Sequence, residues 1–140
     1  MRLAPLNILT LYGITAVSFF IIDLIWIAGV AKTFYARTIG GMLRDQVNWP
    51  AAILFYGIYI GGIVVFVLLP SLKEASSLSR VAILGALLGL FAYGTFDLTA
   101  LALFKDWPVS VTLVDMLWGT VLTAGAATLS MWIARNFLGH

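Results

Sequence analysis

The chain has 140 residues, of which 62% are apolar and only 10% are charged, and its mean hydropathy is +1.06. Soluble domains carry charge on about a quarter of their residues, so this composition excludes a water-soluble protein and predicts an integral membrane protein. The formal net charge is only +2, so the basic pI gives no support for nucleic-acid binding. The absence of cysteine excludes disulfides, thiolate metal sites and cysteine nucleophiles.

Four stretches are long and apolar enough to cross a bilayer, because a spanning helix needs about 20 residues. They predict transmembrane helices at about residues 7–31, 50–69, 80–104 and 109–135. Since these segments take up most of the chain, we expect an all-α, integral membrane bundle of four transmembrane helices. It forms a single domain over residues 1–140, with both termini on one side. The first stretch is too long for a signal-peptide core, and Asp23 interrupts it, so we expect it to be retained.

The segments between these stretches predict the connections. Residues 32–49 are too polar to span, so we expect a loop or a short interfacial helix, with Trp49 as an interface anchor. We expect the second helix to stop at Pro70, because proline has no backbone N–H to donate. Lysine and arginine number four on each side of the membrane in this arrangement, so they do not fix its orientation.

Two G-x-x-x-G spacings predict close contacts between helices. Gly57 and Gly61 lie in the second stretch, and Gly85 and Gly89 lie in the third. Such spacings let helix backbones approach closely in lipid. We therefore expect tight helix packing, and we also predict self-association of the chain into a homo-oligomer.

Three aspartates interrupt the apolar stretches: Asp23, Asp97 and Asp115. A carboxylate near the centre of a membrane helix costs roughly 2.5–3.5 kcal/mol on insertion scales, so it normally faces the protein interior and has a partner. Counting the helical rise of 1.5 Å per residue places all three in the same half of the membrane. We expect them to share a polar pocket that opens toward the first and third connections.

Aromatic and hydroxyl side chains at the same depth are expected to complete this pocket. The candidate proton-binding or ligand-binding residues are Asp23, Asp97, Asp115, Tyr56, Tyr59, Tyr93, Trp26, Trp118 and Thr112. No lysine or arginine lies mid-helix, so repulsion predicts that at least one carboxyl group carries a proton unless a cation joins them. Asp97 is the residue we expect to carry it. For any single aspartate, a purely structural hydrogen bond is the alternative.

Other chemistries have little support in the sequence. His140 is the only histidine and ends the chain, which argues against a histidine metal site or a catalytic triad. An all-oxygen cation site formed by the three aspartates is an alternative. An intramembrane aspartyl protease would need tyrosine and glycine next to its aspartates, which Asp23 and Asp97 lack. We therefore expect no metal and no cofactor.

The motifs resemble a bacterial family of small four-helix membrane proteins that are described only as predicted membrane proteins. The resemblance covers nearly the whole chain and rests on Phe20, Asp23, Trp26, Phe55, Tyr56, Tyr59, Gly62, Pro70, the segment 93–99, Asp115, Trp118 and Gly119. The family pattern has tyrosine before the aspartate of the third helix and asparagine three residues after it, where this chain has Phe96 and Ala100. The resemblance implies a multi-pass protein of the bacterial cytoplasmic (inner) membrane and implies no activity.

The leading functional hypothesis is transport, or proton-coupled binding, of a small cationic or amphipathic molecule at the three aspartates. The alternatives are a lipid-modifying membrane enzyme, with an acid–base pair formed by Asp97 and either Asp23 or Asp115, and an accessory subunit of a membrane complex. The sequence favours a binding protein over an enzyme. The partners it predicts are membrane lipid and this small ligand.

Overall fold

The computed structural model describes residues 7–138, and every regular element in that range is helical. Helix α1 (Ile8–Trp26) continues through a π-helical turn (Ile27–Ala31) into α2 (Lys32–Ile39) and a 3-10 turn (Gly40–Met42). Helix α3 (Trp49–Ile63) continues through a second π-helical turn (Val64–Leu68) into α4 (Leu69–Lys73). Helices α5 (Leu78–Leu103) and α6 (Val109–Phe137) are uninterrupted.

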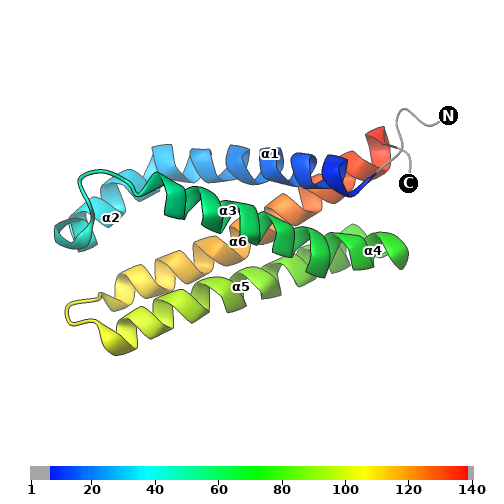
Figure 1. Ribbon diagram of the computed structural model, residues 1–140. Helices are drawn as coiled ribbons and strands as arrows, with labels where there is room; N and C mark the ends of the chain where they lie inside the picture. The colour runs from blue at the N-terminus through cyan, green and yellow to red at the C-terminus, as the bar shows by residue number, and fades with distance from the viewer. Residues whose placement is uncertain (1–6, 139–140) are drawn as a thin grey trace.

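Four helical segments are long and apolar enough to cross a membrane: Ile8–Met42, Trp49–Lys73, Leu78–Leu103 and Val109–Phe137. The segments alternate in direction, so α1 begins and α6 ends at the same end of the bundle (Figure 1). The all-α, four-transmembrane-helix class predicted from the sequence is therefore confirmed. The described residues closest to the two termini also lie on the same side.

The first helical segment is longer than the sequence predicted. Instead of a connection from residue 32, the helix runs on to Met42. Its polar side chains do not end it, because Lys32 and Arg37 are exposed while Ala31 and Ile39 are buried. Hydropathy predicts where a helix can face lipid. The helix itself continues wherever backbone hydrogen bonds are satisfied and one face packs.

Pro70 does not end the second segment, which also corrects the sequence prediction. The segment continues through α4 to Lys73, and the π-helical turn Val64–Leu68 ends two residues before the proline. Proline cannot donate to the carbonyl four residues earlier, and its ring clashes with that carbonyl. A π-helical turn rearranges the hydrogen bonds at this point, so the helix can pass the proline without breaking.

Smaller differences at the other helix ends have local causes. Helix α5 begins at Leu78, earlier than expected, because the Ser77 hydroxyl accepts a hydrogen bond from the backbone N–H of Arg80 at 3.1 Å. This is a typical N-cap, which satisfies a free N–H group in the first turn. Helix α6 continues to Phe137, two residues beyond the predicted end at Arg135.

The glycines of α5 form its contact with α6. A Cβ atom at Gly85 would come within 2.9 Å of the Thr123 carbonyl oxygen, and one at Gly89 would overlap the backbone of Gly119. The pair Gly57 and Gly61 in α3 is less crowded, since a Cβ atom at Gly57 would meet only the Tyr12 hydroxyl at 3.5 Å. The α5 glycines thus join two helices of the same chain. Self-association stays a prediction, and it would have to use another face.

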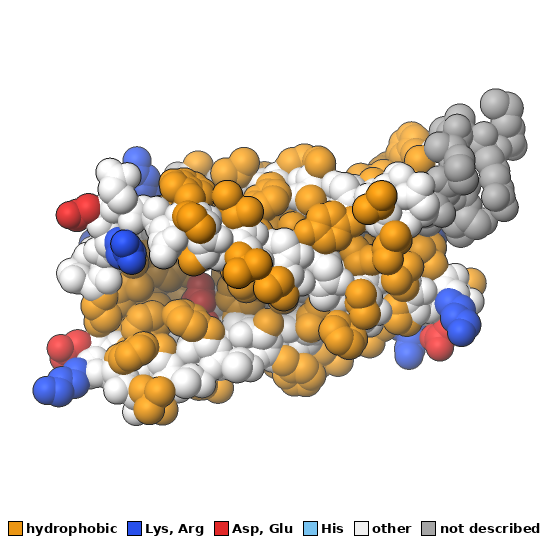
Figure 2. Space-filling model, viewed as in Figure 1, with side chains coloured by type: hydrophobic (Ala, Val, Ile, Leu, Met, Phe, Trp, Pro, Cys, Tyr) orange, Lys and Arg blue, Asp and Glu red, His pale blue; other side chains and the backbone are white. Residues whose placement is uncertain are grey.

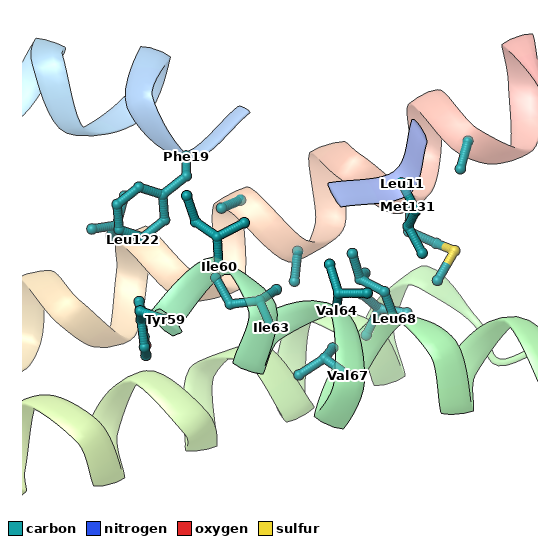
Figure 3. Close-up of a cluster of buried hydrophobic side chains, with 14 residues drawn as sticks. Leu11, Phe19, Tyr59, Ile60, Ile63, Val64, Val67, Leu68, Leu122 and Met131 are labelled. Atoms are coloured by element: carbon teal, nitrogen blue, oxygen red, sulfur yellow. The ribbon is translucent and has the colours of Figure 1, made fainter. Parts of the chain in front are cut away.

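The apolar core lies toward the end where α1 begins and α6 ends. Figure 3 shows side chains from α1, the α3 segment and α6 meeting there. The members that are at most 2% exposed are Leu11, Phe19, Ile60, Ile63, Val64, Val67, Leu68, Val81, Leu122, Ala126, Ala127, Met131 and Ala134. We call this end the core half, and the opposite end, which contains the three aspartates, the site half.

Candidate functional site

The three aspartates of the site half come from three different helices. Asp23 is in the last turn of α1, Asp97 is in the second half of α5, and Asp115 is in the second turn of α6. Asp23 and Asp97 are buried, with 8% and 0% of their surfaces exposed, and Asp115 is half-buried. The bundle therefore brings residues that are distant in the sequence to a similar depth, and it turns them inward.

Asp23 receives hydrogen bonds from aromatic side chains. The indole Nε1–H of Trp118 donates to its Oδ1 at 3.3 Å, and the hydroxyl of Tyr56 is 3.5 Å from its Oδ2. The Trp118 ring also stacks on Trp26, with ring centroids 4.6 Å apart and planes at 9°. Helices α1, α3 and α6 are thus connected around one carboxyl group, and the donors it receives are neutral.

Asp115 has a partner that the sequence analysis missed. The hydroxyl of Tyr35, in α2, donates a hydrogen bond to Asp115 Oδ1 at 2.8 Å. Tyr35 was assigned to a connection because the first helix was expected to end at Ala31. Extending the helix alone would not have found this contact, because 12 residues of regular α-helix turn the facing side by about 120°. The π-helical turn Ile27–Ala31 lies between Asp23 and Tyr35, and both residues line the same hollow.

These residues lie around an open hollow of about 250 Å³, which we call the aromatic–acid cavity. It is lined by Asp23, Trp26, Ile27, Ala31, Tyr35, Tyr56, Tyr93, Asp115 and Trp118. Figure 2 shows acidic side-chain atoms inside a hollow of the site half, between α3 and the α5–α6 pair. Two carboxyl groups therefore face one small space whose other polar groups are indole N–H and phenol O–H.

A second, larger hollow adjoins this cavity at Asp115. It has a volume of about 450 Å³ and is lined by Phe55, Ala92, Tyr93, Phe96 and Asp115. We call it the lateral groove, because it lies between α3 and α5, where Phe55 and Phe96 are 47% and 58% exposed on the lipid-facing surface. Asp115 and Tyr93 line both hollows. The carboxyl group of Asp115 thus lies where an apolar groove meets a polar cavity.

Asp97 lines neither the aromatic–acid cavity nor the lateral groove. Neither of its carboxyl oxygens has a hydrogen-bond partner among the described residues. Asp115 lies on the neighbouring helix α6, which packs along α5. An ionised carboxylate without a partner is costly in such surroundings, so the arrangement favours a neutral, protonated carboxyl group at Asp97.

The other residues predicted for the site are distributed between site and scaffold. Tyr93 lines the aromatic–acid cavity, and its ring packs directly against Gly119. The hydroxyl of Tyr59 pairs with that of Thr123 at 2.7 Å within the core. Thr112 accepts a hydrogen bond from Trp107 Nε1 at 3.1 Å, which fixes the turn before α6. Tyr59 and Thr112 therefore line neither the cavity nor the groove.

The geometry does not favour a metal centre within the described residues. Across positions 7–138, no group of three or more histidine, cysteine, aspartate or glutamate side chains is arranged to hold a metal ion. His140 lies outside the described residues. The three aspartates do not line one cavity together, because Asp97 lies outside the one that Asp23 and Asp115 share.

Comparison with known proteins identifies a family. No curated protein and no solved structure matches the chain. A family model described as "Predicted membrane protein (DUF2177)" matches residues 8–132, which include every helix segment that contributes to the site. The resemblance inferred from the sequence motifs is confirmed as far as a predicted membrane protein family is concerned. The chain belongs to this family of predicted membrane proteins.

Proposed function

We propose that the protein binds a small organic cation in the aromatic–acid cavity and exchanges it for a proton. The observation that carries this proposal is that Asp23 and Asp115 face one cavity and receive hydrogen bonds from neutral tryptophan and tyrosine groups. Two carboxylates in a medium of low dielectric constant repel each other, and neutral donors do not cancel their charge. A proton or a cation is needed to balance it.

The walls of the cavity favour an organic cation over a hydrated inorganic one. Trp26, Trp118, Tyr35, Tyr56 and Tyr93 line it. Aromatic faces attract ammonium groups by about 0.5–2 kcal/mol per contact, and cages of such rings recognise quaternary ammonium ligands. The cavity is smaller than the roughly 300–1,000 Å³ of common ligand pockets, so it fits a cationic head group.

Proton exchange would use the Asp97–Asp115 pair. Asp97 is fully buried and has no hydrogen-bond partner among residues 7–138, so a proton is its simplest source of neutrality. When a cation enters beside Asp115, its positive charge favours the ionised form of the Asp97 carboxyl group. Binding therefore releases a proton, and the affinity for the cation falls as the pH is lowered. This exchange is the step on which proton-coupled transport across a bacterial cytoplasmic membrane would depend.

Titration of the full-length protein in nanodiscs with tetramethylammonium chloride tests the proposal, with sodium chloride as the ionic-strength control. We expect saturable heat that is specific to tetramethylammonium and an affinity at least 10-fold weaker for Asp115→Asn. Asp106→Asn, an exposed site in the α5–α6 connection, is the matched control and should bind like the wild type. Equal responses to both salts, or equal affinities of the two variants, would contradict the proposal.

A second candidate function is a lipid-modifying enzyme, which the position of Asp115 at the mouth of the lipid-facing groove favours. In this reading, Asp97 and Asp115 would form the acid–base pair. Mass spectrometry of nanodisc lipids after incubation tests it, since a modified lipid should accumulate with the wild type and not with Asp115→Asn. The accessory-subunit alternative expects aspartates that face outward, whereas Asp23 and Asp97 are buried within the chain.

A further inference from the structure

The lateral groove has no assigned role in binding a small cation. It is almost entirely apolar, about 450 Å³ in volume, and lies in the part of the bundle that faces hydrocarbon. Among its lining residues, Asp115 and Tyr93 are the ones with polar side-chain groups, and both also line the aromatic–acid cavity. An apolar space that meets a cation-attracting carboxylate is complementary to a molecule with an alkyl chain and a cationic head.

We propose that the ligand is a single-chain amphipathic cation whose head occupies the aromatic–acid cavity while its alkyl chain lies in the lateral groove between Phe55 and Phe96. This inference rests on the proposed function and specifies its ligand. Size supports it, because the cavity alone is below the usual range for a ligand pocket, whereas the groove is within it. The ligand would enter sideways from the lipid, since the groove opens on exposed residues of α3 and α5.

The position of the groove explains how such a ligand would be selected. Lipid tails are as apolar as the groove, so moving a chain from lipid into the groove gives little hydrophobic gain. Specificity must therefore come from the head group at Asp115, and the groove only has to admit the chain. Occupancy of the groove should consequently depend on the Asp115 carboxylate and on competition for the head-group site.

Photo-crosslinking tests this prediction. The probe is a dodecyltrimethylammonium analogue with a diazirine in the middle of its chain, added to the full-length protein in nanodiscs. We expect labels to concentrate on Phe55 and on residues 92–96. Excess tetramethylammonium, which occupies only the head-group site, should reduce this labelling at least fivefold, and so should Asp115→Asn.

A matched pair of variants tests whether the groove itself holds the chain. Ala92→Leu fills the groove, whereas Ala102→Leu makes the same change at an exposed position of the same helix. Labelling should fall at least fivefold in Ala92→Leu and stay unchanged in Ala102→Leu. Circular dichroism and size-exclusion chromatography check that both proteins fold. If Ala92→Leu does not fold, Phe55→Ala, which removes one wall at an exposed position, replaces it with the same expectation.

The outcomes separate this inference from the proposed function. If tetramethylammonium binds but the probe labels exposed residues such as Ile53 and Leu87 as strongly as the groove, with no competition, the chain stays in bulk lipid. The inference then fails, and the proposed function stands. If tetramethylammonium itself does not bind, the proposed function fails first. Labelling of the groove that excess tetramethylammonium reduces supports both the proposed function and this inference.

Discussion

The core half and the site half of this bundle are built from the same four helical segments and differ in what fills the space between them. In the core half, Ile63, Leu68 and Met131 have no exposed surface, and apolar side chains occupy the interior. In the site half, hollows and buried carboxyl groups take their place. The comparison indicates that packing in one half holds the helices while the other half is free to carry polar groups that destabilise it.

The α5–α6 contact extends this comparison, because it passes from one half into the other. Gly85 and Gly89 bring the two helices together beside Thr123, and Gly119 receives the Tyr93 ring at the edge of the site. Close backbone packing in lipid gains van der Waals contacts that larger residues would prevent. The site half is thus held from one side by a tight helix pair, whereas α3 lies apart from α5 and leaves the groove open.

The largest expected effect comes from breaking this tight pair. A Cβ atom at Gly119 would overlap the ring of Tyr93, so Gly119→Ala should lower the free energy of unfolding by about 3 kcal/mol and also weaken tetramethylammonium binding. Gly13→Ala is the control, since nothing lies within 4 Å of a Cβ atom there. Denaturation in mixed detergent micelles measures the free energy of unfolding of both variants. Equal stability of the two variants would show that the α5–α6 contact is looser than described.

The core half should be more sensitive to truncation than the lipid-facing surface of the same helix. Ile63→Ala removes a side chain with 0% exposure and should cost about 2 kcal/mol, mainly through the cavity that remains. Ile58→Ala makes the same change on α3 at a side chain that is 67% exposed, and it should cost less than about 0.5 kcal/mol. The same unfolding assay compares them. A larger loss for Ile58→Ala would instead indicate a partner surface at that face.

Two tyrosines test the polar side of the comparison. The Tyr35 hydroxyl is 2.8 Å from Asp115 and that of Tyr56 is 3.5 Å from Asp23, so only the first has the distance of a strong hydrogen bond. Tyr35→Phe should lower the free energy of unfolding by about 1 kcal/mol, and Tyr56→Phe by less than half of that. Thermal unfolding in nanodiscs distinguishes the two variants. The reverse order would contradict the assigned site geometry.

A small effect on stability is also expected for Asp97→Asn. Because neither Asp97 oxygen has a hydrogen-bond partner within residues 7–138, replacing the acid by an amide removes no hydrogen bond among these residues. We expect a change below about 1 kcal/mol, but the proton released on tetramethylammonium binding should disappear. A pH-indicator dye in weakly buffered solution measures that proton. Unfolding of Asp97→Asn would make Asp97 a structural residue, and unchanged proton release from a folded Asp97→Asn would contradict its role in proton exchange.

Composition and hydropathy determined the membrane location, the four spans and the depth of the three aspartates, because each depends on residue type and on the fixed rise of a helix. The same reasoning failed where tertiary packing decides how far a helix extends and which side chains line a pocket. It ended the first helix at Ala31 and so missed Tyr35, and it assigned Thr112 and Tyr59 to a pocket that they do not line.

Only the tertiary structure decided which side chains meet and where the bundle opens. Asp97 has no described hydrogen-bond partner while Asp115 binds Tyr35, although both are aspartates at similar depth. The reason is that contacts depend on how each helix is rotated and how far it lies from its neighbours. Glycine backbones set the short distance between α5 and α6, and no single stretch of sequence encodes which partner meets them.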